Sequence, residues 1–215
     1  MQNISYILFD LDNTLYPASL GLEKAVNRRV NEYIAAMLGL PLEDAWALRA
    51  ERIKARGYGT TIEWLAAEKQ FDHTRLEEYF AYIHPLDDAE PLSPDPALRS
   101  LLLSFKRPMA IMTNSPREHA ERVLDRLALR DLFTSIFDIR YNGLKGKPCA
   151  DAFNRVLKAA GTTARNCLFV DDSYPYVEGY RRLGGSGVLI DELDEHPDFP
   201  APRIRALEEL RKYLD

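Results

Sequence analysis

Two aspartates separated by one residue follow an apolar run near the start of the chain. The segment ILFDLDNTLY (7–16) places Asp10 and Asp12 directly behind residues 4–9, whose pattern predicts a fully buried strand. Side chains at positions i and i+2 of a strand point to the same side, so the two carboxylates share a face. Like charges this close destabilise each other unless a positive charge lies between them. The pair is therefore either a solvated strand end or a site that holds a cation and carries out chemistry.

Three further polar segments follow other apolar runs or open the next helix. They are Thr113-Asn114-Ser115, the loop 143–148 with Lys145 and Lys147, and Asp171-Asp172-Ser173. Free backbone N–H groups at the start of a helix favour an anion. Carboxylates select hard cations such as Mg²⁺, which binds through one or two of them together with waters and a substrate phosphate. A cation, a lysine and helix amides are what a phosphoryl group with spreading negative charge requires.

Five apolar runs predict the strands that would position these residues. They are residues 4–9, 108–112, 135–139, 167–170 and 187–190. Near-continuous hydrophobicity favours a parallel sheet that is covered on both faces, and helical patterns separate the later runs. One such helix is expected to start with a capping box at residues 115–118, and another to run from Pro148 to Gly161. The fold class predicted is α/β, with a Rossmann-like doubly wound parallel sheet and a site at the carboxyl ends of its strands.

Residues 17–91 break this alternation and contain no convincing strand. Their patterns predict four helices, over 22–37 before Gly39, from Pro41, around 62–65 and over 76–83. We expect an all-helical cap of residues 17–91, inserted after the first strand of a core formed by 1–16 and 92–215. Trp46, Trp64 and Tyr58 are expected to pack inside this cap, and Ser93 to cap the next core helix.

Composition limits the partners. The chain has 215 residues, 46% apolar and 28% charged, with a formal charge of −5 and interspersed signs, so neither a nucleic-acid polymer nor a membrane is expected as a partner. No apolar run approaches the roughly 20 residues of a membrane span, and the start MQNISYILFD does not have the pattern of a signal peptide. Cys149 and Cys167 are too few for a disulfide framework. These features favour a cytoplasmic protein with reduced thiols.

The order and wording of the motifs resemble the haloacid dehalogenase (HAD) superfamily of hydrolases. Its four motifs appear here as DLDNT (10–14), TNS (113–115), KP (147–148) and VDDS (170–173). The insertion after the first strand is where members with a helical C1-type cap carry their lid, so the resemblance spans essentially the whole chain. It implies a Mg²⁺-dependent phosphomonoester hydrolase that forms an aspartyl-phosphate intermediate.

The resemblance implies a role for each catalytic residue. Asp10 would be the nucleophile, and Asp12 the general acid for the leaving oxygen and then the base for the attacking water. Thr113 and Asn114 would bind phosphate oxygens together with nearby amides. Lys147 would neutralise the nucleophile and the phosphate, and the Lys-Pro pair at a helix start favours it over the otherwise similar Lys145.

The same resemblance implies a metal site. Mg²⁺ would take Asp10, the backbone carbonyl of Asp12, and Asp172, with Asp171 reaching it through water. Many relatives carry Asn or Asp four residues after the metal-binding acid, whereas this chain has Tyr176 there. We interpret this as the loss of a second-sphere anchor. The four histidines form no ligand spacing and are interpreted as structural or surface residues: His73, His84, His119 and His196.

A closing cap favours a small phosphorylated metabolite, because it shuts large polymers out and excludes water. The stretches DLDNTLYPASLGL, GYGTTIEWL and YIHPLD resemble the pyrimidine 5′-nucleotidase group, which implies a nucleoside 5′-monophosphate as substrate. Tyr16, Arg56 and Tyr58 are the candidates for selecting it. The sequence leaves open whether the protein is a monomer or a dimer.

Other functions remain open from the residues alone. A sugar-phosphate or phosphoglycolate phosphatase, or a phosphomutase, would share the first motif. A 2-haloacid dehalogenase of the same fold attacks carbon and lacks the second acid, which is present here as Asp12. A receiver-type phospho-switch also combines an acidic pair, a phospho-accepting Asp, a Thr and a Lys. In receivers, however, the acidic pair follows the first strand and the accepting Asp comes later.

Overall fold

A six-stranded, entirely parallel sheet forms the centre of the molecule. The computed structural model describes residues 4–57, 59–200 and 202–214, without the side chains of residues 55 and 56. The strands are β1 (Tyr6–Phe9), β2 (Met109–Met112), β3 (Ile136–Phe137), β4 (Cys167–Asp171), β5 (Ser186–Ile190) and β6 (Arg203–Ile204). Their spatial order is β3-β2-β1-β4-β5-β6. The predicted fold class and all five predicted strands are confirmed; β6 has two residues and no apolar run to reveal it.

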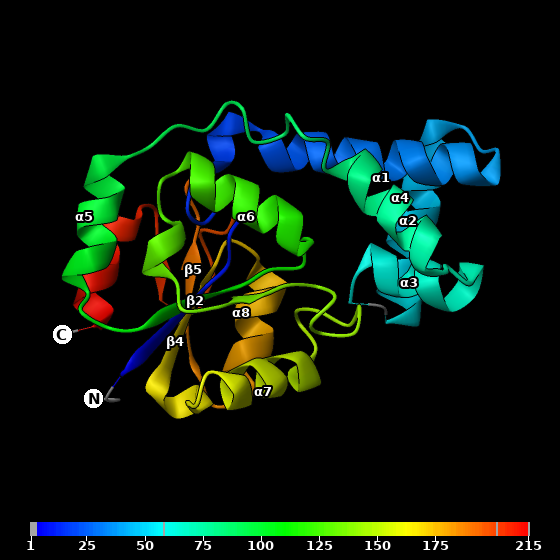
Figure 1. Ribbon diagram of the computed structural model, residues 1–215. Helices are drawn as coiled ribbons and strands as arrows, with labels where there is room; N and C mark the ends of the chain where they lie inside the picture. Colours follow the sequence, from blue (N-terminus) through cyan, green and yellow to red (C-terminus); the bar gives the residue numbers. More distant parts are fainter. Residues whose placement is uncertain (1–3, 58, 201, 215) are drawn as a thin grey trace.

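Side chains of β1 alternate between two apolar layers. Ile7 and Phe9 pack with one hydrophobic cluster, and Tyr6 and Leu8 with another. Helices α5 (Pro96–Ser104) and α6 (Arg117–Arg126) cover the first face, while α7 (Ala150–Ala159) and α8 (Tyr174–Arg181) cover the second, as Figure 1 shows. Burial on both faces explains why these strands have no polar alternation.

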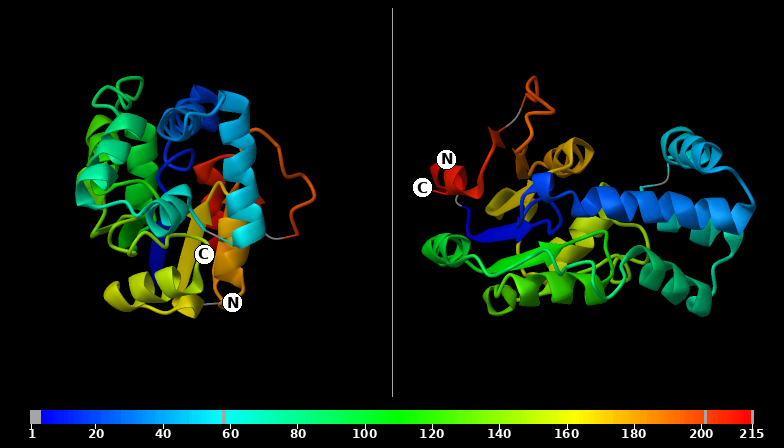
Figure 2. Two further views of the ribbon diagram at one scale, coloured as in Figure 1. Left: turned by 90° about the vertical axis from the view of Figure 1, so that its right-hand side faces the viewer. Right: turned by 90° about the horizontal axis from the view of Figure 1, so that it is seen from above.

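Four cap helices lie beside the sheet rather than on its faces (Figures 1 and 2). They are α1 (Leu22–Leu38), α2 (Leu42–Arg56), α3 (Thr61–Lys69) and α4 (His73–Ile83). Trp64 is buried in their shared apolar cluster, as expected. The expectation for Trp46 is wrong, because its side chain lies on the outer side of α2 and is 46% exposed. Tyr58 lies outside the described residues.

The cap helices rest on the loop between β3 and α7. Arg140 of this loop pairs with Glu77 of α4 at 2.7 Å and places its guanidinium 4.5 Å from the centre of the Phe80 ring. Thr60, at the start of α3, donates its hydroxyl to the Leu144 carbonyl at 3.1 Å. A cation over an aromatic face and an ion pair at the same residue hold the cap helices against the core.

Two helix starts differ from expectation. Asp95, not Ser93, caps α5, and its Oδ1 accepts the N–H groups of Ala97 and Leu98 at 2.8 and 3.0 Å. Ser93 is two residues too far from the first turn, whereas Asp95 directly precedes Pro96 at the first helical position. The predicted capping box of α6 is also wrong. Its helix begins at Arg117 without a side-chain cap from Pro116, and the Ser115 hydroxyl is engaged elsewhere.

No helix among the described residues combines the length and the apolar character needed to cross a membrane.

Candidate active site

A cavity of about 410 Å³ lies between the carboxyl ends of the central strands and the cap helices. Its core side includes Asp10, Asp12, Thr113, Lys147 and Asp172, which arrive from the ends of β1, β2 and β4 and from the loop before α7. The carboxyl ends of neighbouring parallel strands meet at one edge of the sheet, which is why residues more than 100 positions apart converge here. The volume suits a small molecule.

Lys147 is buried between two aspartates. Its ammonium Nζ lies 2.6 Å from Asp10 Oδ1 and 2.6 Å from Asp171 Oδ2, and the side chain is 1% exposed. Burial by itself would lower the pKa of Lys147, but the charges of the two aspartates raise it above its ordinary value. The structure therefore brings Lys147 to the strand ends as a permanent cation, while Lys145 is exposed.

Three carboxylates gather beside this lysine. Ligand oxygens of Asp10, Asp171 and Asp172 lie within 4.8 Å of one another. Asn13 donates its side-chain amide to Asp172 at 3.1 Å and also contacts the carboxylate of Glu23 in the first turn of α1. Sequence reasoning missed Glu23, since it lies in a cap helix and nothing in its spacing links it to the acidic motifs.

The acidic cluster carries more negative charge than the neighbouring lysine can neutralise. Burial, followed by the charges of Asp171 and Glu23, raises the pKa of Asp172 to about 8. The pKa of Asp10 is also raised, first by burial, even though the neighbouring lysine lowers it. One lysine opposes several buried acids, and oxygen donors are what Mg²⁺ prefers, so this donor set fits a divalent cation.

Asp12 accepts hydrogen bonds from three side chains. Its Oδ1 lies 2.6 Å from the Tyr16 hydroxyl and 2.8 Å from Nε2 of His119, and its Oδ2 accepts the Ser115 hydroxyl at 2.9 Å. Burial would raise the pKa of Asp12, but the charge and hydrogen bond of His119 and the Tyr16 bond lower it below its usual range. Tyr16 thus holds Asp12 and does not line the cavity, in contrast to its expected role in selecting substrate.

The interpretation of the histidines needs correction at two positions. His119 contacts Asp12 directly, and His84 lines the cavity; both are buried. His73 and His196 are exposed, as expected. No local motif marked His119, because its partners Asp88 and Asp12 are 31 and 107 residues away and lie in other elements.

Asn114 positions the lysine loop. Its side-chain amide donates to the Lys147 carbonyl at 3.0 Å, and its Oδ1 accepts the Lys147 N–H at 2.8 Å. The side-chain amide thus holds the Lys147 backbone, while phosphate binding at Asn114 stays a prediction. Thr113 is buried at the cavity wall and its Oγ1 accepts the Ser115 N–H at 3.0 Å, so its hydroxyl proton remains free for a phosphate oxygen.

Gly146 should be intolerant of even one added carbon. A Cβ at this position would lie 1.9 Å from Asn114 Oδ1 and 2.9 Å from the Ile139 side chain. We expect Gly146→Ala to break the Asn114–Lys147 pairing, to displace Lys147, and to lower turnover by about 10²-fold, the loss that a small misplacement of a catalytic group causes. Steady-state kinetics measures this. The matched control is Gly184→Ala, where no atom lies within 4 Å of the added carbon. Because Gly184 has φ +79°, this variant should lose some stability on thermal unfolding, while its turnover when folded should stay within about twofold.

The cap side of the cavity carries a polar strip. Arg49 donates from Nη2 to Asn27 Oδ1 at 2.9 Å and from Nε to Thr61 Oγ1 at 2.8 Å. Asn27 in turn contacts Glu23 at 3.4 Å. No carboxylate of the described residues lies within ion-pair distance of Arg49, and its burial lowers the pKa of the guanidinium. Among the described residues, this cation therefore faces the cavity without a counter-ion.

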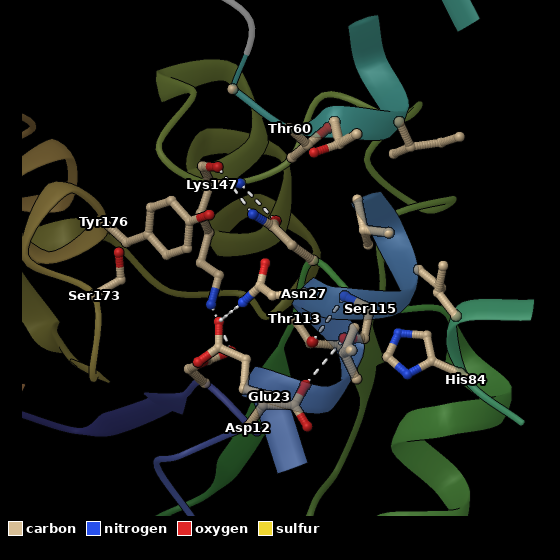
Figure 3. A pocket seen from close by; sticks show the side chains of 18 of the residues that line it. Asp12, Glu23, Asn27, Thr60, His84, Thr113, Ser115, Lys147, Ser173 and Tyr176 are labelled. Atoms are coloured by element: carbon tan, nitrogen blue, oxygen red, sulfur yellow. Dashed lines mark hydrogen bonds and ion pairs between the residues drawn. The ribbon is translucent and has the colours of Figure 1, made fainter. Parts of the chain in front are cut away.

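An apolar and aromatic wall also lines the cavity. Its members are Val26, Val30, Ile53, Ile62, Tyr79, Phe80 and Ile83 of the cap helices. Tyr176 of α8 completes it, and the Lys147 side chain runs alongside its ring, with Nζ 5.1 Å from the ring centre (Figure 3). The residue expected to be a lost metal anchor is therefore part of the cavity wall. Tyr58 and the side chain of Arg56 lie outside the described residues.

The chain belongs to the haloacid dehalogenase-like hydrolase family, whose model matches residues 4–184. This match covers the strand-end acids, the cap helices and the lysine loop together. The family resemblance expected from the four motifs is confirmed, while the pyrimidine 5′-nucleotidase group is not established by it.

Curated relatives are distant but span the chain. Phosphate metabolism protein 8 of Saccharomyces cerevisiae is 28% identical over 84% of this chain and 60% of its own length. Phosphatase MT3486 of Mycobacterium tuberculosis is 25% identical over 99% of this chain and 98% of its own. Glyceraldehyde 3-phosphate phosphatase of Methanocaldococcus jannaschii is 27% identical, covering 98% of each. The family and these relatives identify the chain as a hydrolase and support a phosphatase.

A solved structure has the same fold. The putative HAD-hydrolase YfnB of Bacillus subtilis, described as bound to magnesium with interdomain movement, superposes with a TM-score of 0.63. The match is 21% identical and covers 99% of each chain. It shows that sheet and cap helices together follow a known arrangement.

Proposed function

We propose that this protein is a Mg²⁺-dependent phosphomonoester hydrolase that works through a phosphorylated Asp10, with residues 17–91 as a cap over the active site. The observation that carries the proposal is Lys147, which lines the cavity with its Nζ 2.6 Å from Asp10. A buried ammonium at this distance neutralises the nucleophile and the negative charge that arrives with a phosphate.

In the first step, a carboxylate oxygen of Asp10 attacks phosphorus and the bond between phosphorus and the ester oxygen breaks. Asp12 protonates that leaving oxygen. The negative charge of a bound phosphate raises the pKa of a nearby carboxyl, which favours the protonated form that this step needs. Thr113 donates its hydroxyl to a phosphate oxygen.

In the second step, water attacks the phosphorus of the aspartyl-phosphate and Asp12 accepts the proton. The three donors around Asp12 hold it as a carboxylate, which is the form of a base. Asp10 leaves as a carboxylate that pairs again with Lys147.

The metal would be held by Asp10, Asp172 and the backbone carbonyl of Asp12, with Asp171 in its outer sphere. When bound, Mg²⁺ supplies charge stabilisation to the transferring phosphoryl group. Asp171 is engaged directly with Lys147 at 2.6 Å and accepts the Ser173 N–H at 2.8 Å, which supports an indirect contribution to the metal site. YfnB, described as bound to magnesium, is consistent with this choice of cation.

For the substrate we infer a nucleoside 5′-monophosphate, most simply a pyrimidine one. A base could stack on the aromatic wall at Tyr176 and Phe80 while Arg49 and Asn27 bind its polar edge. Arg49, which forms no ion pair with the described residues, also favours a second candidate, a small sugar phosphate or phosphoglycolate, whose carboxylate or hydroxyl groups it would bind. A relative named glyceraldehyde 3-phosphate phosphatase supports this second candidate.

We infer a cytoplasmic enzyme with a small-molecule partner and no nucleic-acid polymer. The two free cysteines, Cys149 and Cys167, and the net charge of −5 support that setting.

Phosphate release from a panel of nucleotides, sugar phosphates and phosphoglycolate should reveal the substrate class and depend on Arg49. We expect Arg49→Met to lower kcat/KM for the preferred substrate by about 10²-fold, because a hydrogen-bonded charge that contacts the substrate contributes on the order of 3 kcal/mol. The loss should be within about threefold for methyl phosphate, which cannot reach the cap. Arg28→Met, an exposed cation on α1, is the control. Equal losses on every substrate would contradict a selecting role for Arg49.

A further inference from the structure

A buried chain of hydrogen bonds runs from the end of the cap to Asp12. His84, directly after α4, places Nδ1 3.2 Å from Asp88 Oδ2. The same oxygen lies 2.7 Å from Nδ1 of His119 on α6, whose Nε2 lies 2.8 Å from Asp12. The rings of His84 and His119 lie with their centres 4.0 Å apart. All of these side chains are buried to 83% or more, the most exposed being Asp12 at 17%.

His84, Asp88 and His119 lie close enough together to hold a metal ion. Their hydrogen-bond partners nevertheless distinguish this hydrogen-bonded cluster from a metal site. Asp88 already has a cation beside it, because the Arg122 guanidinium lies 3.4 Å from its Oδ1. Both ring nitrogens of His119 are engaged with carboxylates. A second cation would be repelled by Arg122, so hydrogen bonding accounts for the cluster better than metal binding.

The cluster lies at the connection that returns from the cap to the core. Asp88 belongs to the segment between α4 and α5, and Arg122 of α6 donates to the His84 carbonyl at 3.0 Å, which fastens this segment to the core. Tyr16 lies on the outgoing connection and donates to Asp12 at 2.6 Å. Both connections between core and cap therefore contact Asp12. The outgoing connection does so directly through Tyr16, and the returning connection does so from Asp88 through His119.

We propose that His119 is a positioning residue for Asp12, and that Asp88 orients the imidazole of His119. Asp88 belongs to the connection that returns from the cap. The Asp12 carboxylate is therefore held in its catalytic orientation only when this connection packs against α6. A carboxylate held at Oδ1 by two donors and at Oδ2 by Ser115 cannot rotate. An imidazole that is itself oriented by a second carboxylate holds its hydrogen bond in one direction, as in other catalytic constellations with an orienting acid. The inference rests on the proposed function, in which Asp12 protonates the leaving oxygen.

Substitutions at His119 can separate its two contacts. The side-chain nitrogen of Asn lies about where Nδ1 of His lies, so His119→Asn keeps the contact with Asp88 and loses the contact with Asp12. The side-chain nitrogen of Gln reaches about as far as Nε2, so His119→Gln keeps the hydrogen bond to Asp12. Asp88→Asn weakens the orienting partner. His73→Gln is the control, because His73 is exposed on α4 with 87% of its side chain accessible. Thermal unfolding of each variant, loaded with Mg²⁺, checks that the fold is retained.

The test compares leaving groups, because a purely structural role would affect all substrates alike. For the Mg²⁺-loaded enzyme, we expect His119→Asn to lower kcat/KM by about 10²-fold on an alkyl phosphate, the lower end of a general acid's contribution. On 4-nitrophenyl phosphate, whose leaving group departs without a proton, the loss should be under about tenfold. Because Asp12 also acts in the second step, this substrate should give a burst of nitrophenolate. His119→Gln should recover at least about tenfold of the alkyl phosphate loss, and Asp88→Asn should show the same substrate pattern more weakly.

Three outcomes would overturn the proposal: equal losses on both substrates without a burst, identical defects in His119→Asn and His119→Gln, or one equivalent of Zn²⁺ retained by the purified protein and lost in His119→Asn. The last would assign a metal site instead. Failure of the proposed function looks different, since the wild-type protein would then release phosphate from neither substrate.

Discussion

Asp10→Asn is expected to lower phosphatase turnover by 10⁴-fold or more, the scale of loss when a covalent nucleophile is removed (on the order of 10⁴–10⁶). The amide of Asn cannot form the aspartyl-phosphate, so the roles of Lys147 and Asp12 in that step are lost with it. The fold should survive, because Lys147 keeps its 2.6 Å partner Asp171 and the substitution removes one buried negative charge. In the metal-free protein we therefore expect an equal or higher unfolding temperature.

Turnover on the preferred substrate, with calorimetry of the same sample, measures both effects. Asp151→Asn provides the matched control, since Asp151 is an exposed residue in the first turn of α7. Turnover of Asp10→Asn within about tenfold of wild type would assign the nucleophile to another residue. Trapping of a phosphorylated wild-type chain that is absent in Asp10→Asn would locate the intermediate directly.

Removal of divalent cations by a chelator should lower turnover by about 10²-fold or more, and added Mg²⁺ should restore it. The reason is the unbalanced charge around Lys147, where Asp10 and Asp172 both have raised pKa values because burial and neighbouring acids oppose their ionised forms. A bound cation stabilises those ionised forms and the transferring phosphoryl group. Mg²⁺ should also stabilise the folded chain, by about 2.7 kcal/mol at a concentration 100 times its Kd.

Asp172→Asn tests the same site without a chelator. It should raise the Mg²⁺ concentration needed for half-maximal activity and reduce the Mg²⁺-dependent increase in unfolding temperature, whereas the exposed Asp151→Asn should change neither. Thermal unfolding across a Mg²⁺ titration measures the second effect independently of turnover. Full activity in the presence of chelator would contradict the metal assignment, and an unchanged Mg²⁺ response in Asp172→Asn would remove this residue from it.

The sheet could be predicted because burial on both faces leaves a continuous apolar run at each of five strands. β6 could not, since two residues carry no pattern and Arg203–Ile204 pairs through its backbone with β5. Cap helices were recognisable from their spacing and from glycine after α1, where Gly39 adopts the left-handed conformation that ends a helix. Trp46 was misplaced because its size favours burial, while its position on α2 faces away from the cap core.

The sequence by itself determined which chemistry is available. Asp10 and Asp12 follow a buried strand, Asp172 follows another, and the resemblance of these motifs to a hydrolase family predicts that the site lies at their edge of the sheet. Parallel strands bring their carboxyl ends together whatever the details of the loops. The choice of Lys147 over Lys145 agrees with its burial between Asp10 and Asp171.

Only the tertiary structure decided which side chains serve those acids. Ser115 and His119 looked like a helix cap and a structural residue, yet both donate to Asp12 from 103 and 107 residues away. The side chain of Asn114 holds the Lys147 backbone, a contact that no spacing along the chain indicates. A hydrogen bond forms with whatever acceptor lies within about 3 Å in the right direction. That distance depends on how α6, the cap connections and the lysine loop pack, and this packing has no signature in the spacing of residues along the chain.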